Sequence, residues 1–382
     1  MGITGTNGKT TVTYIIEGIV KAARSQAGVI GTINYRLKGK ISPAKNTTPG
    51  PLELQRMLRE MVRSKVGYAV MEVSSHSLDQ GRVDKVLFDV GIFTNITGDH
   101  LDYHKTPANY YKAKKRLFDK LKKNGTAVLN INDKKIAALA RSLKGSVMTY
   151  SVKGAADIAA KDIKLSMNGT SFTMITPGGS FPVNTKLIGI HNVSNILASA
   201  AAGFALKIPA RYIIKGIESV GFVPGRLEAV EAGQPFKVFV DFAHTEDALF
   251  NVLSLLRKIA KKRIVTVFGC GGNRDRTKRP LMGRVACKYS DHVIITSDNP
   301  RFEEPSAIIK EIERGIKEKF SNYNIVVDRK AAIDKAFAGA LRDDIVVIAG
   351  KGHENYQIIK DAVMPFDDRE VALCLLRDKH EN

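Results

Sequence analysis

The chain has 382 residues, 44% of them hydrophobic and 25% charged, which is the composition of an ordinary soluble globular protein long enough for two domains. It contains no apolar run near the about 20 residues of a membrane-spanning helix and no secretory leader, so we expect no membrane insertion. The three cysteines, Cys270, Cys287 and Cys374, show no metal-ligand spacing, and we expect a reduced, cytoplasmic setting.

The formal net charge of +21 can mean nucleic-acid binding, attraction of small polyanionic substrates, or a solvated lysine surface. Lysines occur all along the chain rather than in one basic arm, and neither an RNA-binding aromatic signature nor zinc-finger spacing is present. We therefore expect no nucleic-acid partner, while charge alone leaves the other two meanings open.

Short β-rich runs alternate with segments of helical period, which predicts an α/β fold. In the first part of the chain the pattern predicts strands at 68–73 and 90–95, helices at 12–23, 106–123 and 191–206, and a β-rich stretch at 145–187 with turns at 167–169 and 177–179.

Glycine and proline cluster at 221–225, so we expect a boundary there and two domains, 1–222 and 223–382. Beyond it the pattern predicts strands at 238–240, 264–268, 292–296 and 345–349, and helices at 245–261 and 305–319. Such a series predicts a Rossmann-like sheet with ligand-binding loops at its strand ends.

A glycine-rich loop opens the chain, directly before the first predicted helix. Its glycines let backbone amides converge on phosphate oxygens, Lys9 can reach the β- and γ-phosphates, and the Thr10 hydroxyl can hold Mg²⁺. Ile3 stands where the strict phosphate-loop pattern has its first glycine, and the alternative is a simple turn before a helix. The residues that we expect to bind ATP here are Gly5, Thr6, Asn7, Gly8, Lys9, Thr10 and Thr11.

Polar residues follow the two strands predicted next. Glu72, at the end of the first, is placed to bind Mg²⁺ directly or through water. His100 follows the second, in a stretch with two histidines and two aspartates within six residues, Asp99 to His104. A packed polar histidine is the alternative, but this clustering favours a functional site.

The Gly-Thr-Asn-Gly-Lys-Thr-Thr loop at 5–11 is the variant that marks the Mur ligases and their folylpolyglutamate synthetase relatives, and the whole chain resembles this family. The resemblance implies a central P-loop ATPase domain with a mainly parallel sheet, then a Rossmann-like C-terminal domain that binds the incoming amino acid. In the family a domain and a strand precede the loop, whereas three residues precede Thr4 here. We therefore expect a chain shortened at its N-terminus.

The family's catalytic residues carry over onto this sequence. By resemblance, His100 helps to bind a second metal ion, and alignment on Tyr110, Ala113, Leu117 and Phe118 selects Lys114 as a carbamylated lysine. The alternative for Lys114 is a solvated lysine on a basic helix. The resemblance thus implies Lys9, Glu72, His100 and Lys114 as catalytic residues, and Thr10, Glu72, His100 and carbamylated Lys114 as metal ligands.

Two further sets of residues resemble family binding segments. His191 and Asn195, together with Arg226 at the domain hinge, resemble the surroundings of the ATP adenine, and Asp241 to His244 is similar to an Asp-Tyr-Ala-His segment. The residues similar to the family's nucleotide-peptide site are Thr47, Thr48, Ser74, Ser75, His76, Gln80 and Arg82.

The last part of the chain carries the residues that resemble an amino-acid site. Asp298-Asn299-Pro300-Arg301 is typical of family members that select meso-diaminopimelate, whose additional carboxylate suits the Arg301 guanidinium. Arg274 matches a residue that contacts the same amino acid, Gly350 offers a backbone site, and Glu354 suits the distal ammonium.

Together these matches imply an ATP- and Mg²⁺-dependent ligase of peptidoglycan synthesis. It would add meso-diaminopimelate to UDP-N-acetylmuramoyl-L-Ala-D-Glu through an acyl phosphate, in the cytoplasm and as a monomer. Two alternatives stay open: a lysine-adding or folylpolyglutamate-type ligase, and a nucleotide-binding relative without ligase activity.

Overall fold

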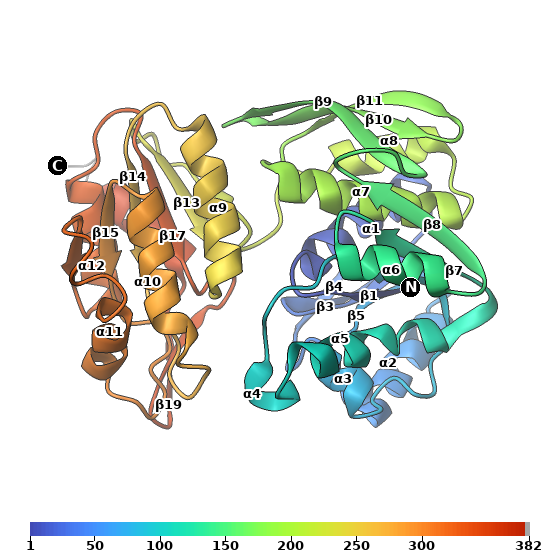
Figure 1. The fold of residues 1–382 in the computed structure, drawn as a ribbon, viewed down its shortest axis with the longest axis horizontal. Coiled ribbons are helices and arrows are strands. Elements are labelled where there is room, and N and C mark those ends of the chain that lie inside the picture. Colours follow the sequence, from blue (N-terminus) through green and yellow to red (C-terminus); the bar gives the residue numbers. More distant parts are fainter. Residues whose placement is uncertain (379–382) are drawn as a thin grey trace. The chain divides into compact units, whose positions relative to one another are not determined.

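The computed structural model describes residues 1–378, and the chain separates into two compact units, Met1–Gly221 and the part from Phe222 onward. Each unit is built around its own mainly parallel sheet with helices packed on it, so the predicted α/β fold class is confirmed (Figure 1). No helix in residues 1–378 is long and apolar enough to cross a membrane.

The N-terminal unit contains an 11-stranded sheet in the order β11-β10-β9-β8-β7-β6-β1-β5-β2-β3-β4. Neighbouring strands pair in parallel throughout the central part of this order, from β9 through β8, β7, β6, β1 and β5 to β2. At the two ends of the sheet, β10 and β11 and likewise β3 and β4 pair antiparallel with their neighbours. Their bounds are β1 (Gly2–Thr4), β2 (Ala27–Ile30), β3 (Asn34–Leu37), β4 (Lys40–Pro43), β5 (Tyr68–Glu72), β6 (Phe88–Phe93), β7 (Leu121–Asn130), β8 (Ser146–Ser151), β9 (Ile158–Ser166), β10 (Gly169–Thr176) and β11 (Gly179–Thr185).

Helices cover the two faces of this sheet. Helix α1 packs against α7 and α8 (Figure 1), and the close approach of α1 to α8 requires Gly216, where a Cβ would lie 2.3 Å from the Ile19 Cα. The helices are α1 (Lys9–Ala22), α2 (Pro51–Arg63), α3 (Ser75–Asp79), α4 (Leu101–His104), α5 (Pro107–Lys115), the 3-10 helix η1 (Phe118–Lys120), α6 (Lys134–Ser142), α7 (Ile190–Ala205) and α8 (Ala210–Glu218).

The helix predicted at 106–123 is too long. It ends at Lys115, a 3-10 turn follows, and β7 begins at Leu121, which pairs with Phe88 of β6. The helical spacing continues through this segment, but pairing with the neighbouring strand outweighs local periodicity from Leu121 onward. The turns predicted within 145–187 are confirmed, because they separate β9, β10 and β11.

The C-terminal unit contains a six-stranded sheet in the order β12-β13-β17-β14-β15-β16, in which only β12 is antiparallel, and a separate hairpin, β18–β19. The strand bounds are β12 (Glu228–Val230), β13 (Lys237–Asp241), β14 (Ile264–Phe268), β15 (His292–Ile295), β16 (Tyr323–Ile325), β17 (Ile345–Ala349), β18 (Tyr356–Ile359) and β19 (Ala362–Pro365).

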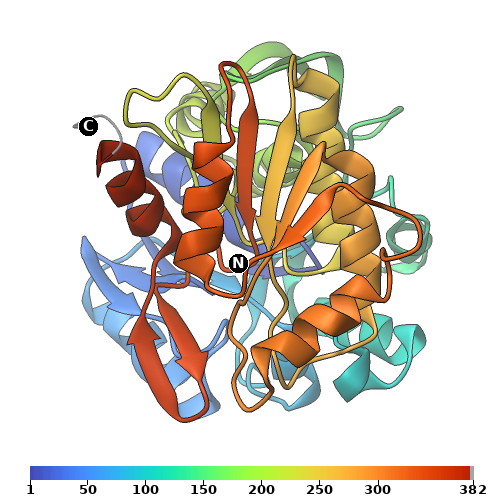
Figure 2. The same cartoon turned by 90° about the vertical axis from the view of Figure 1, so that its left-hand side faces the viewer.

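Helices also sandwich the C-terminal sheet. Helices α12 and α13 pack on one face over a core that includes Val265, Ile333 and Val346, and Figure 2 shows the hairpin β18–β19 below α13. The helix predicted at 305–319 ends at Glu313, and residues 314–319 form turns instead of a regular helix. The helices are α9 (Glu246–Ile259), α10 (Lys278–Tyr289), α11 (Pro305–Glu313), α12 (Arg329–Ala338) and α13 (Asp368–Asp378).

Candidate active site

The glycine-rich loop joins the end of β1 to the start of α1, as the sequence predicts for a phosphate-binding loop. Gly5 and Gly8 both have positive φ, 143° and 86°, which side-chain-bearing residues rarely adopt. Asn95, after β6, fixes the loop: its carbonyl accepts from Thr6 N at 3.0 Å and its side-chain oxygen accepts from Asn7 N at 2.9 Å. The loop therefore presents the amino end of α1, whose first amides lack partners within the helix, to any bound anion.

Lys9 lies folded over this loop. Its ammonium donates to the carbonyl oxygens of Gly5 at 2.9 Å and Thr6 at 2.8 Å. These contacts keep the cation beside the loop backbone, from where it can move to phosphate oxygens without a change in the fold.

Asn195, predicted to lie near the adenine, contacts the phosphate loop itself. A Cβ on Gly8 would lie 2.2 Å from the side-chain oxygen of Asn195, so only glycine fits at position 8. Asn195 is buried on α7 and donates to the Asn192 side chain at 3.2 Å. His191 lies in the first turn of the same helix, while Arg226 belongs to the C-terminal unit.

Glu72 is fully buried at the end of β5, and its carboxylate faces the start of α1. It accepts hydrogen bonds from the Thr10 hydroxyl at 3.0 Å and from both the amide and the hydroxyl of Thr32, each at 2.9 Å. A carboxylate and a hydroxyl next to a phosphate loop are the oxygen ligands that Mg²⁺ prefers. Among residues 1–378, no group of three or more His, Cys, Asp and Glu side chains is arranged to hold a metal ion.

Lys114 is buried, with 2% of its surface exposed, and so is not the solvated lysine that composition alone favours. Its side-chain nitrogen donates to the Gly5 carbonyl at 2.8 Å and lies 4.5 Å from the centre of the Tyr110 ring. Burial, and secondly the charge on Lys9, hold the pKa of Lys114 well below its usual value. Helix α5 thus brings a readily deprotonated amine to the phosphate loop.

Three histidines lie in contact near this amine. The His76 ring centre lies 4.8 Å from that of His100 and 5.4 Å from that of His104. His100 has a left-handed backbone, φ 54°, which places its ring beside Asp99, 3.4 Å away, with 46% of the side chain exposed. Partial burial lowers the pKa of His100, so the neutral ring that a metal ion requires is favoured.

The residues similar to a nucleotide-peptide site also lie together, at the carboxyl end of β5. The Thr48 hydroxyl donates to the Glu72 carbonyl at 2.9 Å and accepts from Ser74 N at 3.1 Å. Arg82 donates to the Thr48 carbonyl at 3.1 Å and to the Gln80 side chain at 2.6 Å. Thr47 contacts Thr32 at 3.1 Å, and Ser75 contacts His104 at 3.0 Å.

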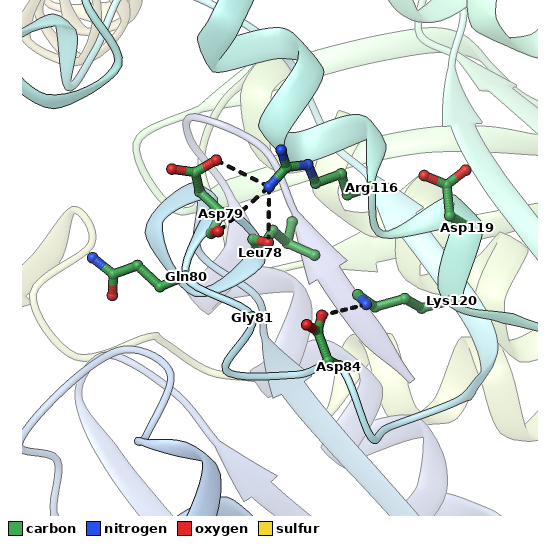
Figure 3. A pocket seen from close by; sticks show the side chains of 8 residues that line it. All are labelled: Leu78, Asp79, Gln80, Gly81, Asp84, Arg116, Asp119 and Lys120. Atoms are coloured by element: carbon green, nitrogen blue, oxygen red, sulfur yellow. Dashed lines mark hydrogen bonds and ion pairs between the residues drawn. The ribbon is translucent and has the colours of Figure 1, made fainter.

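A hollow of about 560 Å³ borders this region, and Gln80 is the predicted site residue that lines it (Figure 3). Arg116 donates to the Asp79 carboxylate at 3.0 Å and to the last carbonyls of α3, while Lys120 pairs with Asp84 at 2.6 Å. Gln80 points away from both ion pairs (Figure 3). The cations of the hollow are thus engaged with aspartates, and Arg116 ties α3 to the end of α5.

In the C-terminal unit, three loops meet at the carboxyl ends of β14, β15 and β17. Gly272 N donates to the Asn299 carbonyl at 2.9 Å, which joins the first loop to the second. Asn299 in turn donates to the Glu354 carboxylate at 2.8 Å, which joins the second to the third. Gly350, with φ 117°, leaves room for Asp298, whose carboxylate oxygen lies 2.7 Å from where a Cβ would stand. The structure therefore brings together residues that the sequence predicts to bind the incoming amino acid.

Arg301 projects into this cluster from a left-handed backbone, φ 53°. Hydrogen bonds to the hairpin hold that conformation: Arg301 N donates to the Ile358 carbonyl at 3.0 Å, and the Arg301 carbonyl accepts from Lys360 N at 2.7 Å. The guanidinium donates to the Gly272 carbonyl at 2.9 Å, and burial, followed by the nearby Arg274, lowers the pKa of Arg301. Two neighbouring guanidinium groups make this a favourable place for a carboxylate.

Arg226 packs its guanidinium 4.8 Å from the centre of the Phe242 ring. The segment around it is bonded to the end of β13, since the Asp241 carboxylate accepts from Leu227 N at 2.7 Å and Phe242 N donates to the Gly225 carbonyl at 2.9 Å. This packing holds the Pro-Gly-Arg segment and the Asp-Phe-Ala-His segment against each other.

Sequence reasoning missed several residues that shape these sites. Thr32 gives Glu72 two of its hydrogen bonds, and its place two residues after the end of β2 is a signal that could have found it. Arg279 is fully buried and donates to Glu303, Glu311 and the Gly271 carbonyl, thereby bracing the loop that carries Arg274. A single arginine near the start of a helix gives no such signal in the sequence.

Comparison with known proteins identifies relatives over nearly the whole chain. One family model, described as the Mur ligase middle domain, matches residues 3–203, and another, the Mur ligase glutamate ligase domain, matches residues 225–352. A protein of Oceanobacillus iheyensis named UDP-N-acetylmuramoyl-L-alanyl-D-glutamate–2,6-diaminopimelate ligase is 46% identical, in a match that covers 100% of this chain and 78% of the relative. A Bacillus cereus protein of the same name is 48% identical, with 97% and 77% covered.

Solved structures give the same result. One described as UDP-N-acetylmuramoyl-L-alanyl-D-glutamate–2,6-diaminopimelate ligase superimposes with a TM-score of 0.70 at 34% identity, covering 100% of this chain and 78% of that one. Folylpolyglutamate synthase of Mycobacterium tuberculosis reaches a TM-score of 0.73 at 18% identity, with 92% and 88% covered, which shows a shared fold alone.

Proposed function

The chain belongs to the Mur ligase family, and we propose that it is an ATP-dependent ligase that adds meso-diaminopimelate to UDP-N-acetylmuramoyl-L-Ala-D-Glu. The observation that carries the choice of amino acid is the convergence of Arg301, Arg274 and Glu354 at one edge of the C-terminal sheet. Two guanidinium groups and a carboxylate match an amino acid that carries an additional carboxylate and a distal ammonium. Relatives at 46% and 48% identity bear the corresponding name.

The N-terminal unit is proposed to bind ATP and to activate the acid substrate. The loop amides and Lys9 neutralise and orient the phosphate chain, so that the γ-phosphoryl group stands in line with the free carboxylate of the muramoyl dipeptide. Transfer of that group gives an acyl phosphate and ADP. The residues around β5, notably Thr48, Ser74 and Arg82, are proposed to hold the dipeptide end.

The oxygen ligands beside the phosphate loop fit Mg²⁺. We propose that Thr10 and Glu72 hold one such ion, and that His100 and a carbamate on Lys114 hold a second. When bound, Mg²⁺ neutralises charge that develops on the transferring phosphoryl group. Carbamylation needs an uncharged amine, and the lowered pKa of the buried Lys114 supplies one.

The C-terminal unit is proposed to bind the incoming amino acid. Arg301 and Arg274 would hold the distal carboxylate and Glu354 the distal ammonium, so that the other amine is free to attack the acyl phosphate. Collapse of the tetrahedral intermediate then forms the amide and releases phosphate. We propose that the reaction takes place in the cytoplasm.

The decisive experiment measures phosphate release and product formation with the muramoyl dipeptide, meso-diaminopimelate or both. The proposal requires that phosphate release depend on both together and that the amide product appear. Lys9→Ala should abolish this activity while the protein stays folded, and Lys21→Ala, which removes an exposed lysine from the same helix, should preserve it. ATP binding without turnover under all conditions would instead identify a nucleotide-binding relative.

A further inference from the structure

A buried ion pair lies directly behind the proposed amino-acid site, and the mechanism above does not use it. Arg329, the first residue of α12, and Asp368, the first of α13, both have fully buried side chains. Two hydrogen bonds join them, from Arg329 Nε and Nη2 to the two carboxylate oxygens, each 2.7 Å long. We propose that Arg329 is a positioning residue that sets the spacing of the two loops that bind the amino acid.

The remaining donors of Arg329 point to those two loops. Nη1 donates to the Ser297 carbonyl at 3.2 Å, and Nη2 donates to the Ala349 carbonyl at 3.0 Å. Ser297 directly precedes the Asp298–Arg301 loop after β15, and Ala349 directly precedes Gly350 at the end of β17. One guanidinium therefore holds the bases of both loops.

This link matters because β15 and β17 are not neighbours in the sheet. Strand β14 lies between them, so no ladder of backbone hydrogen bonds sets the spacing of their ends directly. Asn299 and Glu354 join the tips of the two loops, but both belong to the proposed binding site. Arg329 connects the bases of the same two loops, and its buried side chain has no access to the ligand.

Only arginine suits this role. Its planar group carries donors in a rigid fork, which lets Asp368 fix the orientation while two other N–H groups reach two carbonyl oxygens. A lysine ammonium at the same place could pair with Asp368 but could not span both carbonyls. A buried ion pair does not by itself show that the pair stabilises the fold. The positioning role therefore rests on the geometry of the Arg329 hydrogen bonds.

The same sheet offers a control with similar bonds at the amino ends of its strands, where the Arg263 side chain is 45% exposed whereas that of Arg329 is fully buried. Arg263 precedes β14 and pairs with Asp344, which precedes β17, through Nε at 3.1 Å and Nη2 at 2.6 Å. It also donates to one backbone carbonyl, that of Gly339, at 2.9 Å. Arg263→Gln therefore removes a similar set of bonds far from the Asp298 and Gly350 loops.

The test compares Arg329→Gln, Arg329→Lys and Arg263→Gln in the full chain, and it rests on the proposed function for its kinetic part. Loosening both loops should raise the KM for meso-diaminopimelate about ten- to hundredfold in Arg329→Gln, with the KM for ATP unchanged. Amide hydrogen exchange should become faster at both 298–301 and 350–354. Arg263→Gln should lower thermal stability without changing that KM or the exchange of either loop.

Two results would overturn the positioning role. The first is a folded Arg329→Gln variant whose KM for meso-diaminopimelate and loop exchange equal those of the unmutated protein. The second is a change of the same size in this KM and in loop exchange in Arg263→Gln. If Arg329→Gln does not fold, Arg329→Lys decides, since it keeps the charge pair and must still lose protection in at least one loop. If the unmutated chain forms no amide with meso-diaminopimelate, the proposed function fails, while the exchange measurements still decide the role of Arg329.

Discussion

The side-chain nitrogen of Lys114 lies 2.8 Å from the carbonyl oxygen of Gly5, although the two residues are 109 positions apart in the chain. The contact places a buried amine from α5 on the backbone of the phosphate loop. It joins the two features of the N-terminal unit on which the proposed ATP-dependent chemistry depends.

Lys114→Ala should be nearly inactive, because it removes the amine that we propose to become a carbamate ligand. Short-chain carboxylic acids, which can occupy the vacated space as anions, should restore part of the activity. Lys115→Ala, which removes an exposed lysine from the same helix, is the control and should behave as the unmutated protein. A density map of the active protein that shows an unmodified amine at Lys114 would contradict the carbamate.

Gly8→Ala should destabilise the protein and weaken ATP binding, because its Cβ would lie 2.2 Å from the Asn195 side-chain oxygen. Gly39→Ala is a matched control: its φ of 79° resembles the 86° of Gly8, but no atom lies within 4 Å of its Cβ. The control should lose only the about 1–2 kcal/mol of a left-handed backbone. Equal losses of ATP affinity in calorimetric titrations of both variants would refute the steric explanation.

Arg301→Ala should narrow the preference for meso-diaminopimelate over lysine, mainly by impairing use of meso-diaminopimelate. In the unmutated protein, lysine leaves the Arg301 guanidinium without its anion, which costs about 1–3 kcal/mol or roughly ten- to hundredfold in affinity. Amide formation with each amino acid at matched concentration measures the preference. Arg314→Ala, which removes an exposed charge from the same unit, should leave the preference for meso-diaminopimelate unchanged. Equal use of both amino acids by the unmutated protein would reject the assigned specificity but not the ligase reaction.

Asp241 should make the protein less stable as pH rises through the weakly acidic range. Burial raises the pKa of Asp241 from 3.8 to about 6, although Arg226 opposes the change. Because the folded state holds this proton more tightly than the unfolded state, the stabilising effect is complete below about pH 4 and is lost by pH 6 and above. Asp241→Asn, which does not ionise, should therefore gain stability relative to the unmutated protein by about 3 kcal/mol over that range. Denaturant unfolding at a series of pH values measures this difference, and a pH-independent difference would disprove it.

The sequence predicted those parts of the fold that local patterns determine. Strands β14 and β17 begin and end where the mostly apolar runs at 264–268 and 345–349 do, because parallel strands that are buried on both faces are predominantly apolar. The prediction failed at Leu121. The helical spacing of apolar residues continues there, but the chain forms β7 and pairs with β6. The insertion of β17 between β13 and β14 could not be predicted either, since chain order does not specify neighbours in a sheet.

The site shows the same division. A loop such as that from Gly5 to Thr11 can be identified from sequence, because its chemistry requires consecutive residues. The burial of Lys114, the contact of Asn195 with Gly8 and the bonds of Arg329 depend on elements that meet only in the folded chain. In a sequence with 59 basic residues, a buried lysine or arginine looks like any exposed one.

The hairpin β18–β19 holds the Arg301 loop mainly through its main-chain atoms: Arg301 N donates to the Ile358 carbonyl and Lys360 N donates to the Arg301 carbonyl, while the Gln357 side chain adds one bond to the Asp298 carbonyl. The main-chain bonds exist whatever side chains the hairpin bears, so the hairpin sequence can diverge at positions other than Gln357 without displacing the loop. A homologous enzyme could therefore acquire a new amino-acid preference by exchanging a few loop side chains on an inherited frame. For protein engineering, the segment from Asp298 to Arg301 is accordingly to be grafted between members of the family together with the residues that hold it, notably Arg329 and Gln357.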